Sequence, residues 1–270
     1  KAVLADRLGY GAVSLTEHHF INILLMPAPL QFAVKIAAHT DHVKIMTSIV
    51  VLPIHDMRTF AGEVVVADIF TEGRLMLGVG RGAFAYEIER LGVPMSETQE
   101  RFDESLEVLQ ALLTEEEVSW DGKYYKFDPV TIMPRPVRQP NLMMAVMNPE
   151  GIYQCTKRGF HIQTTPLAGN HQLLMDQVDG FNRAKSEMGD KGRDLTLSLS
   201  RLAFVSDNAA DRWKKVEQAH DYYSRFDNVY TGPGIVEGGM IKPLPRAQSI
   251  EELDKGLLIC TPQQMIDELS

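Results

Sequence analysis

Three short polar clusters have residue types and spacings that could form a catalytic or anion-binding site. Residues 17–19 read Glu-His-His and bring one carboxylate and two imidazoles together. Residues 78–82 read Gly-Val-Gly-Arg-Gly, so three glycines surround an arginine directly after an apolar run. Glycines let the backbone approach an anion closely, and a guanidinium can hold phosphate oxygens with two donors. Residues 148–149, Asn-Pro, are typical of a helix N-terminus, where free N–H groups also favour an anion.

Each cluster also has a plainer interpretation. Residues 78–82 could be a tight strand-to-helix turn with a solvated arginine, and they are not a dinucleotide-binding fingerprint, because the third glycine comes one residue early. An isolated pair of histidines is more often structural or solvated than catalytic. Residues 17–19 lack the His-x-x-x-His spacing of a zinc site, so we expect no metal. Residues 148–149 could serve only to start a helix.

The composition favours a globular protein and argues against a nucleic-acid-binding or membrane protein. The chain has 270 residues, of which 44% are hydrophobic, enough for a sizeable core. Its net charge of −9 argues against nucleic acid and against an anionic membrane surface. Cys155 and Cys260 lie far apart and form no disulfide framework, which fits a reducing, cytoplasmic location. No apolar run approaches the ~18 residues of a membrane-spanning helix, so we expect no membrane partner.

The elements that must position these clusters alternate between strand and helix. We expect strands at residues 12–15, 43–52, 75–79, 142–147, 162–165 and 195–205. We expect helices at residues 1–8, 29–40, 58–70, 96–113, 149–158, 171–188 and 209–226, and one that starts at residue 261. This alternation predicts a parallel sheet. Polar residues follow the carboxyl ends of four strands, which favours a (β/α)₈ TIM barrel over an open doubly wound sheet.

Several finer expectations follow from the same pattern. Ser96, with Gln99 three residues later, should cap the helix at residues 96–113. The Asp-Gly pair at residues 121–122 should turn a hairpin. Residues 1–270 should form a single barrel domain that begins inside the first helix and ends before the eighth strand. Because a barrel without strands 1 and 8 has two open edges, we expect this chain to be a fragment of a longer protein.

Four motifs, in order and spacing, resemble the bacterial luciferase-like FMN-dependent monooxygenases. They are TEHHF (16–20), TSIVVLP (47–53), GRLMLGVGRG (73–82) and LGV (91–93). The likeness continues through RFDE at residues 101–104 to Thr-Pro at residues 261–262, and so covers nearly the whole chain. The resemblance implies a luciferase-like (β/α)₈ barrel, usually dimeric, and we expect a homodimer. It also implies O₂ and reduced FMN (FMNH₂), the latter supplied by a separate flavin reductase.

The resemblance also assigns roles to individual residues. His18 matches the catalytic histidine beside the flavin, with Glu17 and His19 as supports. The bond Ser48–Ile49 matches a non-proline cis peptide under the flavin ring. The cofactor-binding residues that the resemblance implies are Thr47, Ser48, Ile49, Arg81, Met147, Asn148 and Gly151. The residues expected to line the substrate pocket are Phe20, Ile54 and Phe84, together with Met26.

The implied activity is oxidation of a small, largely apolar organic substrate through a C4a-(hydro)peroxyflavin. Residues 226–256, with their Gly- and Pro-rich stretch at 232–245, correspond to a mobile lid insertion, although a surface loop without a role has the same composition. Gly80 replaces the reactive cysteine of the luciferases proper, which makes light emission doubtful. Two alternatives stay open: a deazaflavin (F420)-dependent hydride-transfer oxidoreductase, and a non-catalytic flavin-binding partner subunit.

Overall fold

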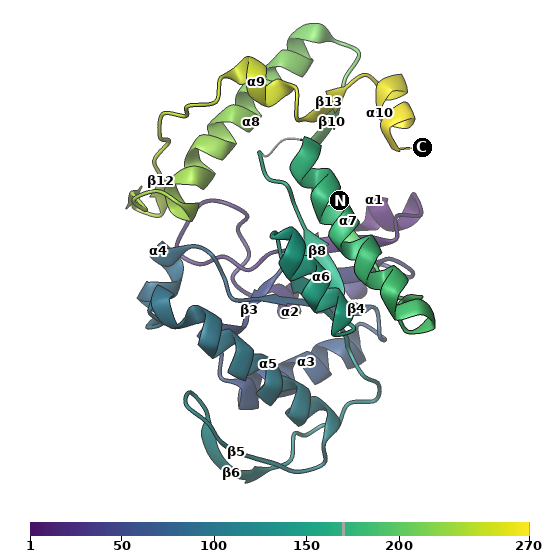
Figure 1. Ribbon diagram of the computed structural model, residues 1–270, viewed down its shortest axis with the longest axis vertical. Coiled ribbons are helices and arrows are strands. Elements are labelled where there is room, and N and C mark those ends of the chain that lie inside the picture. Colours follow the sequence, from purple (N-terminus) through teal and green to yellow (C-terminus); the bar gives the residue numbers. More distant parts are fainter. Residues whose placement is uncertain (169–170, 270) are drawn as a thin grey trace. The chain divides into compact units, whose positions relative to one another are not determined.

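The computed structural model describes residues 1–168 and 171–269. These residues form two compact units, Lys1–Ala145 and Val146–Ser270, each built from alternating strands and helices (Figure 1).

The first unit is organised around parallel strands. Four of them pair in the order β1 (Ala12–Leu15), β2 (Lys44–Thr47), β4 (Leu75–Gly80) and β7 (Asn141–Ala145). The short strand β3 (Val50–Val51) also pairs with β4, with Val50 opposite Val79. The side chains of Ile45, Leu75 and Leu77 are completely or almost completely buried. Burial on both faces is what a parallel sheet covered by helices requires.

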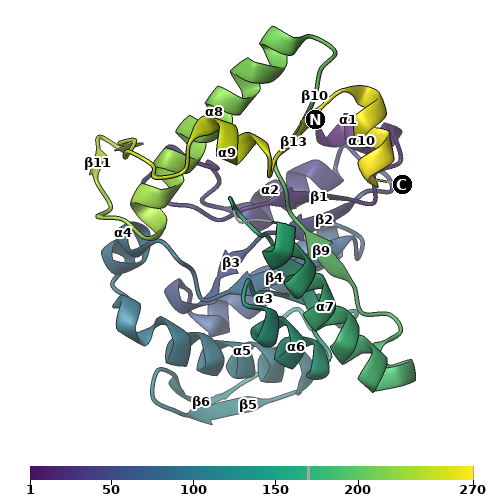
Figure 2. The ribbon, with the colours of Figure 1, turned by 45° about the horizontal axis from the view of Figure 1, so that its top comes forward.

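Helices pack against these strands. They are α1 (Ala2–Arg7), α2 (Pro29–Ala37), α3 (Met57–Phe70), α4 (Ala85–Ile88) and α5 (Thr98–Thr114), with 3-10 turns η1 (Leu52–Ile54), η2 (Glu89–Leu91) and η3 (Met95–Glu97). Helices α3 and α5 lie side by side in both views (Figure 2) and bury apolar residues such as Phe60, Val64, Leu109 and Leu112. Strands β5 (Val118–Asp121) and β6 (Lys126–Val130) form a separate hairpin.

The second unit repeats the alternation with shorter strands. Its elements are α6 (Pro149–Lys157), β8 (His161–Thr164), α7 (His171–Met188), η4 (Gly189–Gly192), β9 (Leu197–Leu199), β10 (Ala203–Val205), α8 (Ala209–Tyr230), β11 (Val236–Glu237), β12 (Met240–Ile241), α9 (Ile250–Asp254), β13 (Leu258–Cys260) and α10 (Pro262–Leu269). Strand β8 pairs in parallel with β9, and β10 pairs in parallel with β13. A cluster of buried side chains including Val216, Tyr223 and Ile259 joins α8 to this second strand pair.

The expected α/β fold of parallel strands alternating with helices is confirmed, and two strand predictions need correction. The single strand predicted at residues 43–52 is interrupted, because β2 ends at Thr47 and β3 begins at Val50. The bond between Ser48 and Ile49 in this gap is cis, as the resemblance implied. The strand predicted at residues 195–205 is also two strands, since β9 and β10 pair with different partners.

Other local predictions had mixed outcomes. The hairpin at residues 121–122 is confirmed. Capping by Ser96 is wrong, because Ser96 lies in η3 and α5 begins only at Thr98, whose hydroxyl donates to the carbonyl of Met95 at 2.9 Å. Strand β13 was not predicted. Within residues 1–168 and 171–269, no helix has both the length and the apolar character needed to cross a membrane.

The segment predicted to be a lid, residues 226–256, contains regular structure. Its first five residues belong to α8, and β11 pairs with β12 as a small antiparallel ribbon. Asn228 anchors this ribbon from inside the helix. Its amide group donates to the carbonyls of Ile235 and Lys242 at 2.9 and 2.7 Å and accepts from the N–H of Ile235 at 2.9 Å. The composition of residues 232–245 gave no signal for this pairing.

Gly82 and Gly92 offer a matched test of packing in the turn after β4. Both have positive φ, +80° and +84°, but only a Cβ at Gly82 would collide with neighbours, at 2.6 Å from Ile88 and 2.7 Å from Val51. We expect Gly92→Ala to lower the free energy of unfolding by about 1–2 kcal/mol through its backbone conformation. Gly82→Ala should lose about 1–3 kcal/mol more through overpacking. Equal losses in urea unfolding would contradict this account of the turn.

Candidate active site

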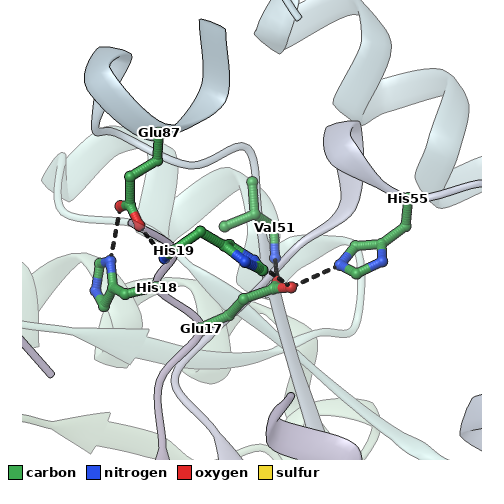
Figure 3. Close-up of polar contacts among 6 residues, drawn as sticks. All are labelled: Glu17, His18, His19, Val51, His55 and Glu87. Carbon is green, nitrogen blue, oxygen red and sulfur yellow. Dashed lines mark hydrogen bonds and ion pairs between the residues drawn. The ribbon is translucent and has the colours of Figure 1, made fainter. Parts of the chain in front are cut away.

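The carboxylate of Glu17 lies at the centre of a hydrogen-bonded cluster that follows β1 (Figure 3). Its side chain is fully buried. One carboxylate oxygen accepts from the backbone N–H of Val51 at 2.7 Å. The other contacts Nε2 of His55 at 2.8 Å and Nε2 of His19 at 3.2 Å. Glu17 therefore ties the end of β1 to β3 and to the residue that follows η1.

The pKa shifts in this cluster favour a negatively charged Glu17 and a positively charged His19. Burial alone raises the pKa of Glu17, but the hydrogen bonds from His19, His55 and Val51 outweigh it and lower this pKa to about 2. The hydrogen bond to Glu17 in turn raises the pKa of His19 above its ordinary value. Glu17 thus stays a carboxylate throughout the physiological range and holds His19 in place.

His18 points to a different carboxylate, that of Glu87 in α4. Its Nδ1 lies 2.9 Å from one oxygen of Glu87, and the backbone N–H of His19 donates to the other oxygen. A carboxylate only accepts hydrogen bonds, so Nδ1 carries the proton and Nε2 is the ring nitrogen left for other partners. The ring of His18 also stacks on Phe84, with centroids 4.9 Å apart and planes 22° from parallel. Its orientation is therefore set by two contacts.

The strand ends beside this cluster are held by Thr47 and Ile49. The buried hydroxyl of Thr47 donates to the carbonyl of Gly78 and accepts from its N–H, both at 2.8 Å. The side chain of Ile49 covers Gly80 so closely that a Cβ there would lie 2.7 Å from its terminal methyl group. A larger residue at position 80 would therefore need the side chain of Ile49 to move.

Arg81 extends from the end of β4 with little to neutralise it. Its side chain makes one long hydrogen bond, 3.4 Å to the hydroxyl of Thr98, and within the described residues no carboxylate forms an ion pair with it. Arg81 is exposed, as an arginine that is to receive an anion from solvent must be.

The other predicted anion-binding residues belong to the second unit. Asn148 is the N-cap of α6, and its side-chain oxygen accepts from the N–H of Gly151 at 3.0 Å. That N–H, predicted to face a phosphate, is therefore already used by the cap. The carbonyl of Met147 accepts from Gln177 at 2.9 Å, and the same amide donates to the carbonyl of Thr165 at 3.1 Å. The completely buried Gln177 thus fixes the loops after β7 and β8.

The predicted pocket residues have unequal environments. Phe84 is 4% exposed and contacts His18, whereas Phe20 is 53% exposed with a φ of +64°. Ile54 ends η1 and is half-buried. Met26 accepts from the backbone N–H of His18 through its carbonyl at 3.0 Å. In the first unit, the structure therefore brings Phe84 and Met26 together with His18.

Three residues of this site were missed by reasoning from the sequence. Glu87 orients His18, His55 is the second histidine on Glu17, and Gln177 holds the Met147 loop. Only His55 gave a signal, since it follows the Leu-Pro motif at a predicted strand end. Among residues 1–168 and 171–269, no group of three or more His, Cys, Asp or Glu side chains could hold a metal ion.

Parallel strands alternate with helices, and His18 and Arg81 follow the carboxyl ends of two of these strands, which is the arrangement of an enzyme of the (β/α)-barrel class. Within that class, residues 1–268 match the sequence model of the luciferase-like monooxygenases, and the chain belongs to this family of oxidoreductases.

Individual relatives agree with this family. The chain is 28% identical over 277 residues to the oxygenase component of the flavin-dependent trigonelline monooxygenase of Acinetobacter baylyi, covering 98% of this chain and 76% of that protein. It resembles the oxygenating constituent of 3,6-diketocamphane monooxygenase from Pseudomonas putida, solved with FMN, with a TM-score of 0.75, 17% identity and coverage of 99% and 79%. An F420-dependent secondary alcohol dehydrogenase has a TM-score of 0.76, 17% identity and coverage of 99% and 82%. The two structural likenesses show a shared fold.

Glu17→Gln tests whether the charge of Glu17 stabilises the cluster. The folded-state pKa of about 2 lies below the ordinary 4.5, so the stabilisation is complete above pH 4.5 and is lost as pH falls toward 2. We expect the variant to be less stable by about 1–3 kcal/mol near neutral pH, with a difference that shrinks as pH falls from 4.5. Urea unfolding at several pH values measures it, with the exposed Glu89→Gln as control. A difference independent of pH would contradict the assignment.

Proposed function

We propose that this protein is a flavin-dependent monooxygenase that uses reduced FMN and O₂ to oxidise a small, largely apolar organic substrate. The observation that carries the proposal is His18, held by Glu87 and Phe84 in one orientation with Nε2 available. A histidine with its second nitrogen fixed by a carboxylate is suited to hold or move a proton at a reacting atom. Membership of the luciferase-like family and the flavin-dependent relative from A. baylyi support the same reaction class.

The described residues fit FMN. Arg81 has no carboxylate partner among them and would receive the phosphate. Thr47, Ser48 and Ile49 would contact the flavin ring beside Gly80, which has no side chain of its own and is covered by Ile49. In the second unit, the start of α6 is a further anion-favouring helix N-terminus. The proposed contacts there are the backbone at Met147, the side chain of Asn148 and the N–H of Gly151, which a phosphate would have to take over from the side-chain oxygen of Asn148. Bound reduced FMN would supply the electrons that activate O₂.

The protein's side chains would handle the proton, position the catalytic histidine and form the surface for the substrate. His18 would hold or donate a proton through Nε2, while Glu87 keeps Nδ1 protonated and the ring aligned. Glu17 and His19 act as positioning residues, because Glu17 fixes His19 and His19 donates its backbone N–H to Glu87. Phe84, with Phe20, Ile54 and Met26, would provide the apolar surface for the substrate.

Exclusion of water is assigned to residues 226–256. Water at the reacting atoms would divert reduced flavin and O₂ to H₂O₂, so a cover that excludes water from the substrate would have a direct chemical use. Asn228 and the ribbon β11–β12 give this segment a fixed base from which its remaining residues could close. We propose further that the protein is served by a separate flavin reductase, as the description of the A. baylyi relative as an oxygenase component suggests. A cytoplasmic homodimer is part of the same proposal and rests on the sequence resemblance alone.

The reaction class is tested by mixing the protein with reduced FMN without oxygen and then with O₂ in a stopped-flow spectrometer. We expect a transient absorbing species, distinct from both reduced and oxidised FMN, before oxidised FMN appears. In His18→Ala this species should decay about 100-fold faster or fail to form. Glu87→Gln should give an intermediate defect and a displaced pH profile, because the amide that replaces the carboxylate has no negative charge and only one acceptor oxygen for the Nδ1–H of His18 and the N–H of His19. The neighbouring, exposed Glu89→Gln is the matched control.

Two results would contradict the proposal. Immediate, featureless reoxidation in the wild type, with tight binding of reduced deazaflavin instead, would favour the hydride-transfer alternative. A wild-type transient that His18→Ala leaves unchanged would remove His18 from the reaction.

Arg81 is tested by comparing FMN with riboflavin, which lacks the phosphate. We expect Arg81→Gln to weaken binding of reduced FMN by about tenfold or more, since a charge-assisted hydrogen bond is lost, and to leave riboflavin binding unchanged. Arg90→Gln, in the next turn of the chain, should change neither affinity. Equal weakening for both flavins in anaerobic fluorescence titrations would show that Arg81 acts on folding or on the ring, and not on the phosphate.

A further inference from the structure

A cavity of about 250 Å³ lies within the first unit, and His18 and Arg81 are not part of its wall. Its wall is formed by η1 and the start of α3, the turn after η2, α5, and the hairpin β5–β6. The wall contains three cationic side chains, Arg58, Arg101 and Lys126, and one carboxylate, Asp56; a second carboxylate, Asp121, pairs with Lys126 from outside the wall. The cavity is therefore cationic on a chain whose net charge is −9. Such a contrast favours an anionic occupant.

The three cations are not equally available. Arg58 forms two hydrogen bonds with Asp56, and Lys126 pairs with Asp121 at 2.6 Å on the exposed side of the hairpin. Arg101 forms no ion pair within residues 1–168 and 171–269, and its Nε is buried there without a hydrogen-bond partner. The terminal nitrogens of Arg101 form no hydrogen bond within those residues either, so they are the donors that a ligand in the cavity would meet, and an acceptor there would be favoured.

The remaining wall residues indicate which uncharged part a ligand of this cavity would have. Ile54, Leu91, Val93 and Phe127 are apolar, and the ring of Tyr124 lies 5.6 Å from the guanidinium carbon of Arg101. A cavity of about 150 Å³ already accepts benzene, so this one has room for a single ring with a substituent. A guanidinium matches a planar carboxylate with two parallel hydrogen bonds. The combination fits a flat apolar group that carries one carboxylate.

We propose that this cavity is a binding site for a small aromatic carboxylate, with Arg101 as the group that takes the carboxylate. The site is also connected to the Glu17 cluster. His55 lines the cavity, its Nε2 contacts Glu17 at 2.8 Å, and its carbonyl accepts from the hydroxyl of Tyr125, another wall residue, at 3.1 Å. An occupant therefore touches residues one hydrogen bond away from the carboxylate that positions His19.

The probe is sodium benzoate, titrated into the full chain in a calorimeter without flavin, so the result does not depend on the proposed reaction. We expect saturable one-to-one binding that Arg101→Gln weakens by about tenfold or more. Lys126→Gln should weaken it by a smaller factor. Lys123→Gln is the matched control, because Lys123 is a hairpin lysine paired with Glu100 at 2.6 Å and is absent from the wall.

Location is read from the histidine ring resonances in NMR spectra. Benzoate should shift the ring signals of His55 and leave those of His42, which is not in the wall, unchanged. Thermal unfolding confirms that each variant is folded, and Lys126→Gln replaces Arg101→Gln if the latter is not. No saturable binding, undiminished binding in the folded variants, binding of inorganic phosphate as tight as that of benzoate, or unchanged His55 signals would each overturn the proposal.

Discussion

The buried carboxylate of Glu17 is the constraint on which the first unit depends. A charged group without water needs its acceptor capacity filled, and here the N–H of Val51 and the imidazoles of His19 and His55 fill it. Those partners come from three segments of the chain, so satisfying one charge fixes the relative position of the residues after β1, in β3 and after η1. This arrangement also positions His18. Its neighbour His19 is held at the ring by Glu17 and at the backbone N–H by Glu87.

Much of the framework was predictable, because the strongest signals are local. The run at residues 75–79 became β4, and residues 148–149 became the start of α6. The predictions failed where distant partners decide the structure. Residues 43–52 and 195–205 have the composition of continuous strands, but the cis bond after Ser48 and the separate partners of β9 and β10 divide them. Ser96 failed as a cap for a local reason, since it lies in η3 and the Thr98 hydroxyl donates to the carbonyl of Met95 in that turn.

The site was predictable only where a motif carried it. The family likeness indicated His18 and Arg81, whose roles stay predictions, and the implied cis bond is present. Glu87 lies 69 positions from His18, and nothing in the residues around it distinguishes it from the solvated Glu89. Gln177 is one glutamine in an amphipathic helix, and only the structure shows that its amide reaches two carbonyls. Contacts between side chains of distant segments leave no periodic trace in a single sequence.

The three hydrogen bonds of Asn228 hold the base of the ribbon β11–β12 and do not reach its tip, so the two parts should tolerate sequence changes differently. The base, at Ile235 and Lys242, is fixed to α8, whereas Gly238 and Gly239 at the tip both adopt positive φ and a Cβ at Gly238 would meet nothing within 4 Å. Insertions between the two glycines would lengthen the tip without disturbing the helix that holds its base. Diversification within this family could therefore proceed by adding residues at one point of the chain, with the rest of the sequence unchanged.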